Sequence, residues 1–435
     1  MPKSPLTLIT AIALVSGAPA AAQLTNGVGL PAEGARAPDG PVTPGQPLAV
    51  NQAPVPTQRP AFPGQARAPA VVTRTPIAVE VKAHNLNHPW GLAFIGDGRM
   101  LITEKPGSMR VLDMASGTPV AGVQGIPAVV FKGDGGLLDV VTDPAFAQNR
   151  MIYFTYVEPR GEEDSGLVVA KARLKPPKSG GNQAPMYTLE NVTTLLRATG
   201  AKEPGHYGSR LVFDAEGYLF VSLGERFFYP TRGEAQSLYS ILGKVLRIST
   251  DGKAAPGNPF DRDQQLEDHP RAEIWSYGHR NPQALAISPV DGRLWESEHG
   301  PNGGDEVNLI GRGANYGWPL VAYGNNYDKT PINGGRTVLK DTEQPRYVWQ
   351  ATVAPGGMDF YSAGLIREWK NNLFVAALAG QHLARLVIEG DRIVGEERLL
   401  QDQHQRIRDV KQGPDGALWV VTDDADGRLI RLAPS

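Results

Sequence analysis

Short apolar runs recur in pairs along the chain from residue 77 onward, and a turn separates the two members of each pair. In the first pair, residues 90–94 are followed by Asp97-Gly98 and a second run at 100–104. The same pattern recurs at 136–154, 209–222, 283–296, 357–376 and 408–421. Apolar runs joined by a short turn, most of these turns containing glycine, are typical of β-hairpins. The pattern therefore predicts six hairpins in series.

Six hairpins in the region 77–435 leave about 60 residues for each unit, which is longer than a minimal propeller blade. We expect the excess in loops such as 158–186, 250–272 and 320–348, and one short helix within 233–242. Radial repetition of small sheets leaves only short, protected edges. The sequence therefore predicts an all-β fold, a six-bladed β-propeller of four-stranded antiparallel blades. Propeller geometry further leads us to expect a strand at 77–81 beside 429–432, to complete the last blade.

The first 76 residues have a different character. Lys3 precedes an apolar stretch that is too short to span a bilayer, and Ala20-Ala21-Ala22 offers a small-residue cleavage site. Residues 1–22 are thus predicted to be a signal peptide, although a short buried helix is an alternative. Residues 24–76 contain eleven prolines and one aromatic residue. We expect 23–76 to form a Pro-rich disordered linker with little surface to bury, and 77–435 to form the propeller domain.

The composition of the chain excludes several classes of function. The formal net charge of −2 argues against nucleic acid as a main partner, because phosphate binding needs a strong basic surface. The chain has no cysteine, which excludes disulfide scaffolds, thiol catalysis and cysteine-ligated metals. No later stretch is apolar enough to span a membrane. We therefore expect a mature protein that is periplasmic or secreted; its oligomeric state cannot be predicted.

Polar residues gather just before the first strand or just after the second strand of the predicted hairpins. His206 precedes the third hairpin between glycines; it is either a base that acts near neutral pH or a loop histidine satisfied by backbone. Arg280 and Asn281 precede the fourth hairpin. They suit a planar carboxylate or carbonyl ligand, or form an ion pair between blades.

Two further motifs carry candidate chemistry. Residues 298–306 combine a Gly300-Pro301 turn with Asp305 and Glu306, a mixture of oxygen ligands that calcium accepts, but also an ordinary acidic turn. Arg406 and Arg408 precede and enter the sixth hairpin, where alternation puts both on one face, either solvated or paired with an anion. Asp409 points the other way and is not expected to be their partner.

Taken in order, these motifs resemble those of the soluble glucose/sorbosone dehydrogenases, which depend on pyrroloquinoline quinone (PQQ), and most closely the bacterial aldose sugar dehydrogenases. The segments that carry the resemblance are 89–94, 278–283, 299–301, 305–308, 315–319 and 406–410. The likeness runs from about residue 77 to the C-terminus. It implies a six-bladed propeller that oxidises aldose sugars at the anomeric carbon to lactones, with hydride transfer to the quinone.

The resemblance also implies roles for individual residues. His206 would be the general base and Arg280 would polarise the quinone. PQQ would be bound by Arg280, Asn281, His299, Arg406, Arg408 and Asp134. Calcium would be bound by the carbonyl oxygens of Gly300 and Pro301, which hold the cofactor's cation, and by Glu306 and Tyr316, which hold a second cation between blades. Three positions depart from the pattern of the family or of the glucose enzymes. Asp134 replaces a common glutamine, His299 replaces a glutamine of the glucose dehydrogenases although histidine is familiar in the aldose branch, and the cofactor lysine of the glucose enzymes has no clear match at 379–382.

Two other functions stay open on the sequence alone. One is a calcium-dependent propeller lactonase or esterase, which should draw its calcium ligands from several blades. The other is a non-catalytic binding propeller. The favoured hypothesis implies an aldose substrate and an external electron acceptor, neither of which the sequence identifies.

Overall fold

The computed structural model describes residues 36, 38, 40–51, 55, 57–177, 185–227, 229–260 and 270–435. The predicted signal peptide at 1–22 lies outside these residues. The regular secondary structure of the described residues is mainly β, and the helical segments are short: α1 (Phe146–Asn149), η1 (Tyr229–Ala235), η2 (Ile332–Gly335), η3 (Arg367–Trp369) and η4 (Gln401–Gln403). No helix in the described part of the chain combines the length and the apolar character needed to cross a membrane.

Four of the sheets contain four antiparallel strands each. In spatial order, their strands are β1 (Ile77–Leu86), β24 (Gly427–Pro434), β23 (Leu418–Thr422) and β22 (Ile407–Gln412); β10 (Leu211–Phe213), β11 (Leu219–Leu223), β12 (Lys244–Ile248) and β13 (Ile274–Tyr277); β14 (Pro282–Ile287), β15 (Leu294–Glu298), β16 (Asp305–Leu309) and β17 (Tyr347–Trp349); and β18 (Pro355–Phe360), β19 (Leu373–Ala377), β20 (His382–Glu389) and β21 (Arg392–Leu399).

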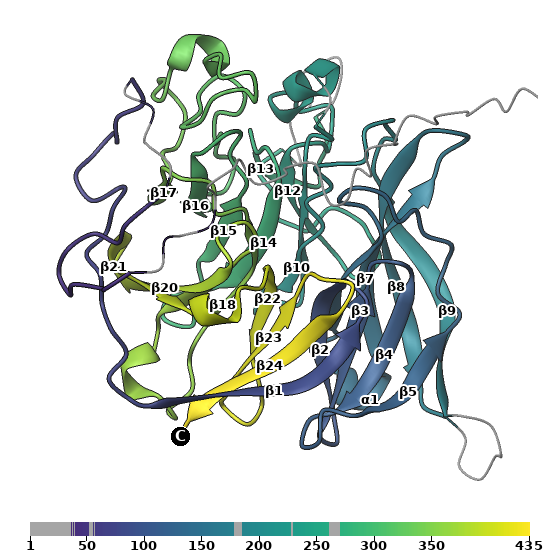
Figure 1. Ribbon diagram of the computed structural model, residues 1–435. Coiled ribbons are helices and arrows are strands. Elements are labelled where there is room, and N and C mark those ends of the chain that lie inside the picture. Colours follow the sequence, from purple (N-terminus) through teal and green to yellow (C-terminus); the bar gives the residue numbers. More distant parts are fainter. Residues whose placement is uncertain are drawn as a thin grey trace, which may run out of the picture.

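The fifth sheet has eight strands. Their order is β2 (Pro89–Gly96), β3 (Arg99–Glu104), β4 (Ser108–Asp113), β5 (Pro119–Gln124), β9 (Met186–Arg197), β8 (Ser165–Lys175), β7 (Met151–Pro159) and β6 (Leu137–Thr142). Two antiparallel four-stranded halves are joined here by a short parallel pairing of β5 with β9. The set of sheets is consistent with a β-propeller (Figure 1).

The six predicted hairpins are confirmed as the pairs β2–β3, β6–β7, β10–β11, β14–β15, β18–β19 and β22–β23. In the first, Asp97 and Gly98 both have positive φ, 51° and 65°, as a two-residue turn with the twist of a hairpin requires. The predicted closure is also confirmed, because β1 pairs with β24 and places Val79 opposite Leu432.

Two local predictions are wrong. Residues 158–186 are not a loop, because they contain β8, whose apolar positions are buried between β7 and β9. The helix expected within 233–242 is a 3₁₀ segment at 229–235 instead. Its Pro230 and Gly233 favour a tight turn over a regular α-helix. The expected loop 250–272 lies partly outside the described residues.

All six hairpins contribute to one buried charged centre. Arg210, which is fully buried just before β10, pairs at 3.1 Å with carboxylates from β6 and β22 and donates to a β14 carbonyl at 3.0 Å. Its guanidinium also lies 4.3 Å from the ring centroid of Trp90 in β2. A side chain at Gly357 in β18 would collide with Asp409 and Arg210, so glycine is required there. These contacts fix the hairpins around a shared centre.

The Pro-rich segment differs from its expected character. Gln65, Ala68 and Ala70 are buried, with 0–2% of their surface exposed, and Val71 donates to the Glu396 carbonyl of β21. The expectation of a disordered linker with little to bury is therefore wrong for the described residues 57–76. The reason is that backbone amides and amide side chains, which hydrophobicity does not count, satisfy the open edges of β17 and β21.

Candidate active site

His206 lies in the loop before β10 and is held in a left-handed conformation, with φ of 51°. Neighbouring Gly208 also has positive φ, and a Cβ there would come within 2.8 Å of the backbone of Ser222 and Gly224. The His206 ring is 1% exposed and its Nδ1 lies 2.9 Å from Glu225 Oε1. Its Nε2 makes no hydrogen bond within the described residues. His206 is therefore not satisfied by backbone alone, as one alternative required.

The protonation of this pair follows from its surroundings. Burial, reinforced by the nearby Arg280 and Arg232 cations, holds the pKa of His206 well below its usual range. Burial raises the pKa of Glu225 to about 7. When Glu225 is ionised it accepts the Nδ1 proton of His206, which leaves the lone pair on Nε2. The imidazole can then take up a proton.

Asn281 and Arg280 lie beside this loop. The backbone amide of Gly208 donates to Asn281 Oδ1 at 3.1 Å. Arg280 donates to the carbonyl oxygens of His299 at 3.0 Å and Gly300 at 2.7 Å, and it makes no ion pair with a carboxylate in the described residues. The buried Nε and Nη2 of Arg280 and the Nδ2 of Asn281 have no hydrogen-bond partner among the described residues. These donors can bind a ligand with several acceptor oxygens.

His299 completes this side of the site. Its Nε2 lies 2.8 Å from the Pro355 carbonyl, which only accepts, so Nε2 carries the proton. Burial, together with the nearby His206 and Arg280, holds the pKa of His299 well below its usual range. The lone pair of His299 therefore lies on Nδ1, and no carboxylate among the described residues pairs with this ring to stabilise its protonated form, as Glu225 does for His206.

A basic cluster lies near the His206 loop, to which Asp134 connects it. Arg408 donates to Gln283 Oε1 at 2.8 Å and pairs with Asp423, while Arg406 lies just before β22 in the field of the same carboxylate. Lys105 Nζ donates to the Gly133 carbonyl at 3.0 Å, and burial lowers its pKa. Although burial opposes it, Arg408 and Lys105 hold the pKa of Asp423 well below its usual range.

Asp134 connects the basic cluster to the proposed base. Its Oδ2 accepts from the backbone amide of His206 at 3.1 Å, and Lys105 and Arg408 are close enough to act on its charge. Burial raises the pKa of Asp134. The structure thus brings Asp134, Arg406 and Arg408 together, whereas Asp409 pairs elsewhere, with Arg210.

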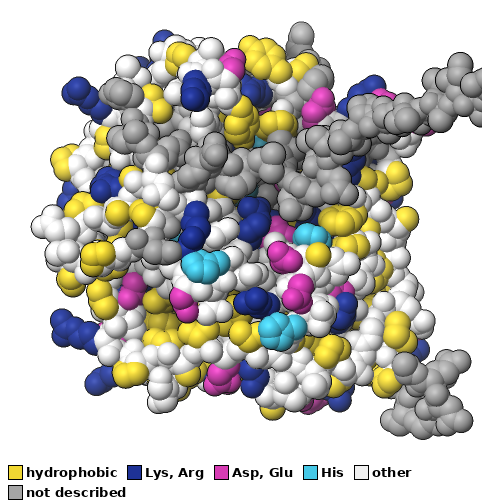
Figure 2. Space-filling model, in the orientation of Figure 1, with side chains coloured by type: hydrophobic (Ala, Val, Ile, Leu, Met, Phe, Trp, Pro, Cys, Tyr) yellow, Lys and Arg dark blue, Asp and Glu magenta, His cyan; other side chains and the backbone are white. Residues whose placement is uncertain are grey.

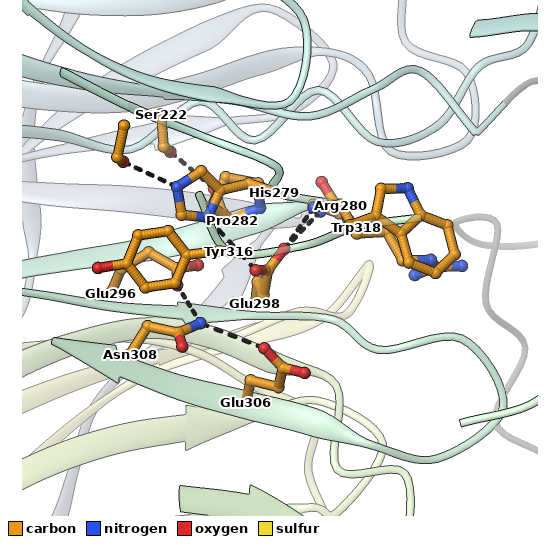
Figure 3. Close-up of polar contacts among 12 residues, drawn as sticks. Ser222, His279, Arg280, Pro282, Glu296, Glu298, Glu306, Asn308, Tyr316 and Trp318 are labelled. Atoms are coloured by element: carbon orange, nitrogen blue, oxygen red, sulfur yellow. Dashed lines mark hydrogen bonds and ion pairs between the residues drawn. The ribbon is translucent and has the colours of Figure 1, made fainter. Parts of the chain in front are cut away.

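A second group of buried carboxylates lies in the sheet formed by β14–β17 (Figure 3). Glu296 and Glu298 end β15, and Glu306 lies opposite Glu298 in β16. Asn308 donates to Glu296 at 2.9 Å and approaches Glu306 at 3.4 Å. His279 Nδ1 lies 3.4 Å from Glu298 Oε1, and ligand atoms of His279, Glu296 and Glu298 lie within 4.8 Å of one another.

The charges of this group are poorly compensated by protein. Burial, followed by the charge of Glu298, raises the pKa of Glu296 and of Glu306 well above the usual range. Neither glutamate pairs with a lysine or arginine in the described residues. Glu296 Oε1 and Asn308 Oδ1 are buried without a partner there. Converging oxygen atoms of this kind suit a hard divalent cation.

The remaining predicted metal ligands have mixed placements. Gly300, Pro301, Glu306 and Tyr316 line one pocket with Arg280 and Tyr323. The phenol oxygen of Tyr316, however, is bonded to the Leu309 carbonyl at 2.6 Å and the Gly311 amide at 2.8 Å. Asp305 accepts from the backbone amides of Gly300, Val353 and Ala354, so it is occupied in shaping the turn.

Comparison with known proteins agrees with these motifs. A family model described as glucose/sorbosone dehydrogenase matches residues 86–431. The aldose sugar dehydrogenase YliI of Escherichia coli is 41% identical over 371 residues, covering 84% of this chain and 94% of that protein. The apo-form crystal structure of the soluble aldose sugar dehydrogenase from E. coli is 40% identical, with a TM-score of 0.75, covering 82% of this chain and all of that one. The PQQ-bound structure of aldose sugar dehydrogenase from Streptomyces coelicolor is 28% identical, with a TM-score of 0.65, covering 83% of this chain and 99% of that one.

Proposed function

The chain belongs to the glucose/sorbosone dehydrogenase family, and from that premise we propose that it oxidises aldose sugars at the anomeric carbon to lactones, with PQQ as cofactor. The observation that carries the proposal is the pairing of a neutral, buried histidine with a carboxylate beside a group of donors that lack partners. The PQQ-bound relative supports the choice of cofactor.

The residues present fit PQQ, which is a tricarboxylate. Arg280 and Asn281 offer buried donors without a partner among the described residues, and Arg406, Arg408 and Lys105 supply positive charge nearby. These residues would hold the cofactor's oxygens and carboxylates, with Asp134 and His299 beside them. When bound, PQQ supplies an electrophilic quinone that accepts a hydride.

The chain's own chemistry is the removal of a proton. Nε2 of His206 takes the proton of the sugar's anomeric hydroxyl, because water is a poor base near neutral pH. Glu225 holds the ring through Nδ1, keeps the proton on that atom and stabilises the imidazolium that forms. Arg280, fixed by the carbonyl oxygens of His299 and Gly300, would use its free Nη2 and Nε to hold oxygens of the cofactor.

We propose two calcium sites. The carbonyl oxygens of Gly300 and Pro301 would hold a cation next to the cofactor. A second cation would bind the buried carboxylate group, where Glu306 is joined by Glu296, Glu298 and the free oxygen of Asn308. Tyr316 would contribute its main-chain oxygen, since its phenol is occupied. Neutralising buried carboxylates in this way stabilises the native state.

Three broader features complete the proposal. The two halves of the eight-stranded sheet count as separate blades, which gives six blades around Arg210. The protein is exported, after removal of residues 1–22, to the periplasm or the medium. Its electrons leave to an external acceptor.

The competing functions are less well supported. A propeller lactonase should collect its calcium ligands from several blades, whereas the carboxylates of the second proposed cation site, Glu296, Glu298 and Glu306, come from β15 and β16 of one sheet. A non-catalytic binding propeller could use the free arginine donors, but it leaves the His206–Glu225 pair without a role.

One experiment separates the three functions. Apo-protein is given PQQ and calcium, and reduction of a dye acceptor is followed with aldose present or absent. Sugar-dependent dye reduction is expected. Its absence, with ester hydrolysis or simple ligand binding instead, would contradict the proposal. His206→Gln, loaded in the same way, is the matched control for background reduction.

A further inference from the structure

The amino-terminal strap, defined as residues 57–76, runs along the outer edges of two neighbouring sheets. In Figure 1 it follows the side of the molecule that carries β17 and β21. Val348 of β17 donates to the Gln65 carbonyl at 2.8 Å, and Val71 donates to the Glu396 carbonyl of β21 at 3.0 Å. Its far end is anchored by Thr73, whose hydroxyl donates to Glu397 and accepts from Trp369. The strap precedes residues 86–431, to which the family model corresponds.

Two buried glutamines of the strap reach inward to one loop. Gln58, 4% exposed, donates to the Gly324 carbonyl at 3.0 Å. Gln65, fully buried, has its Oε1 3.1 Å from the hydroxyl of Tyr323, and its Nε2 donates to the Pro345 carbonyl at 2.9 Å. The amide of Gln65 is bonded at both ends, whereas Gln58 is bonded only through Nε2 and its Oε1 is buried without a partner among the described residues. Losing such a buried bond leaves an unsatisfied polar atom, so these contacts fix the geometry of the loop.

The loop that they hold, residues 323–327, touches both sides of the candidate active site. Asn325 pairs through its backbone with Asn302, which directly follows Pro301, whose carbonyl oxygen is a predicted calcium ligand. Gly324 packs so closely on this turn that a Cβ would lie 2.1 Å from the Gly303 carbonyl. The same loop also reaches the proposed base through two aromatic contacts. The ring centroids of Tyr327 and Phe227 lie 6.0 Å apart, and those of Phe227 and His206 lie 4.7 Å apart.

We propose that Gln58 and Gln65 are positioning residues: they hold the 323–327 loop, and through it the 301–304 turn and the aromatic wall beside His206. The strap is thus a structural part of the site rather than a spacer. The expected effect of the strap on catalysis rests on the function proposed above, whereas its expected effect on the order of the 323–327 loop does not.

The test uses full-length protein with no PQQ or calcium added. Backbone hydrogen exchange is measured for the amides of 302–304 and 323–325 in the parent, Gln65→Leu and Gln58→Ala. Gln58→Ala is the milder variant and serves if Gln65→Leu folds poorly. Thr73→Val is the matched control, because it weakens the strap at its far end and touches neither the loop nor the site. We expect exchange in both segments to become about tenfold faster, or more, in the glutamine variants and to stay near the parental rate in Thr73→Val.

The outcomes are decisive in either direction. Unchanged exchange in both glutamine variants, or equal acceleration in Thr73→Val, would overturn the proposal, since the strap would then only add general stability. In the loaded enzyme, Gln65→Leu should raise the KM for aldose more than it lowers kcat, because the loop lines the site without taking part in proton transfer. If no variant or parent oxidises aldoses, the proposed function fails while the exchange result stands.

Discussion

Two buried histidine–glutamate pairs lie within one molecule, and their differences separate a reactive site from a structural one. His206 Nδ1 is 2.9 Å from Glu225, and its other ring nitrogen has no partner in the described residues. His279 Nδ1 is 3.4 Å from Glu298, but its Nε2 is bonded to Ser276 Oγ at 2.8 Å and its ring stacks on Tyr316. The two carboxylates differ as well, because Glu298 already accepts from two backbone amides.

The contrast shows that a buried histidine–carboxylate pair is not by itself a catalytic signature. What matters is the second nitrogen, which must be free to exchange a proton, and the charge of the neighbours. Cations surround the first pair, whereas Glu296 and Glu306 lie near the second. The first environment suits an anionic cofactor and proton transfer, and the second suits a bound cation. Figure 2 shows acidic, basic and histidine side chains mixed in the middle of one face of the molecule, rather than in a single-sign patch.

The largest expected effect on turnover comes from replacing His206, the histidine of the reactive pair. His206→Gln should lower kcat by about 10²–10⁴-fold, because the amide can hydrogen-bond the sugar but cannot accept its proton. PQQ affinity, measured by titration of apo-protein, should change little. His279→Gln is the control: it should lower the melting temperature while the folded fraction keeps most of its turnover. Turnover of His206→Gln within a few-fold of the parent would remove His206 as the base and turn attention to His299.

The next largest effect, on kcat and its pH dependence, tests the role of Glu225 beside His206. Base function needs ionised Glu225, whose pKa is raised to about 7, so kcat should rise as pH increases through about 7. Glu225→Gln should lower kcat by about 10- to 100-fold, the value of a charged hydrogen bond, and should remove that rise from the pH profile. Parallel kcat–pH profiles of parent and variant would show that Glu225 does not set the protonation of His206.

A smaller effect, on thermal stability, tests the calcium site proposed beside the His279–Glu298 pair. Calcium bound only by the native state should raise the melting temperature of the parent by several degrees, and chelator should reverse the rise. Glu296→Gln should remove most of this response, because it replaces a carboxylate whose Oε1 lacks a partner. Glu225→Gln is the matched control and should keep the response. Superimposable melts of the parent with calcium and with chelator would contradict the second calcium site.

The sequence predicted the hairpins and the clustering of motifs, because apolar alternation and turn residues are local signals. It also carried an overlooked signal for the carboxylates: Glu104, Glu225, Glu298 and Asp423 each end or follow the second strand of a hairpin. Three of these touch a candidate residue, but which one meets His206 depends on the packing of separate loops. Lys105 was missed for the same reason, since it reaches the arginines only across two sheets.

The strap shows a different limit of sequence reasoning. Its prolines and scarce aromatics indicated disorder, yet its described part is held by polar contacts that hydrophobic patterning does not register. Such contacts depend on where edge strands leave unpaired groups, which is a property of the assembled sheets. A segment of this composition can therefore be ordered by a neighbouring edge although it could not fold alone.

The smallest expected effect concerns the structural pair, His279–Glu298. Ser276→Ala removes the fully buried hydroxyl that engages His279 Nε2 and so gives this histidine the same free nitrogen as His206. An unsatisfied buried nitrogen should cost roughly 1–3 kcal/mol, seen as a modest fall in melting temperature. Turnover should not change, because His279 is fully buried beside Glu296 and Glu298 and is not part of the proposed proton transfer. A loss of kcat in Ser276→Ala comparable to that of Glu225→Gln would show that the two pairs are coupled, and that a free ring nitrogen is not what distinguishes the reactive histidine.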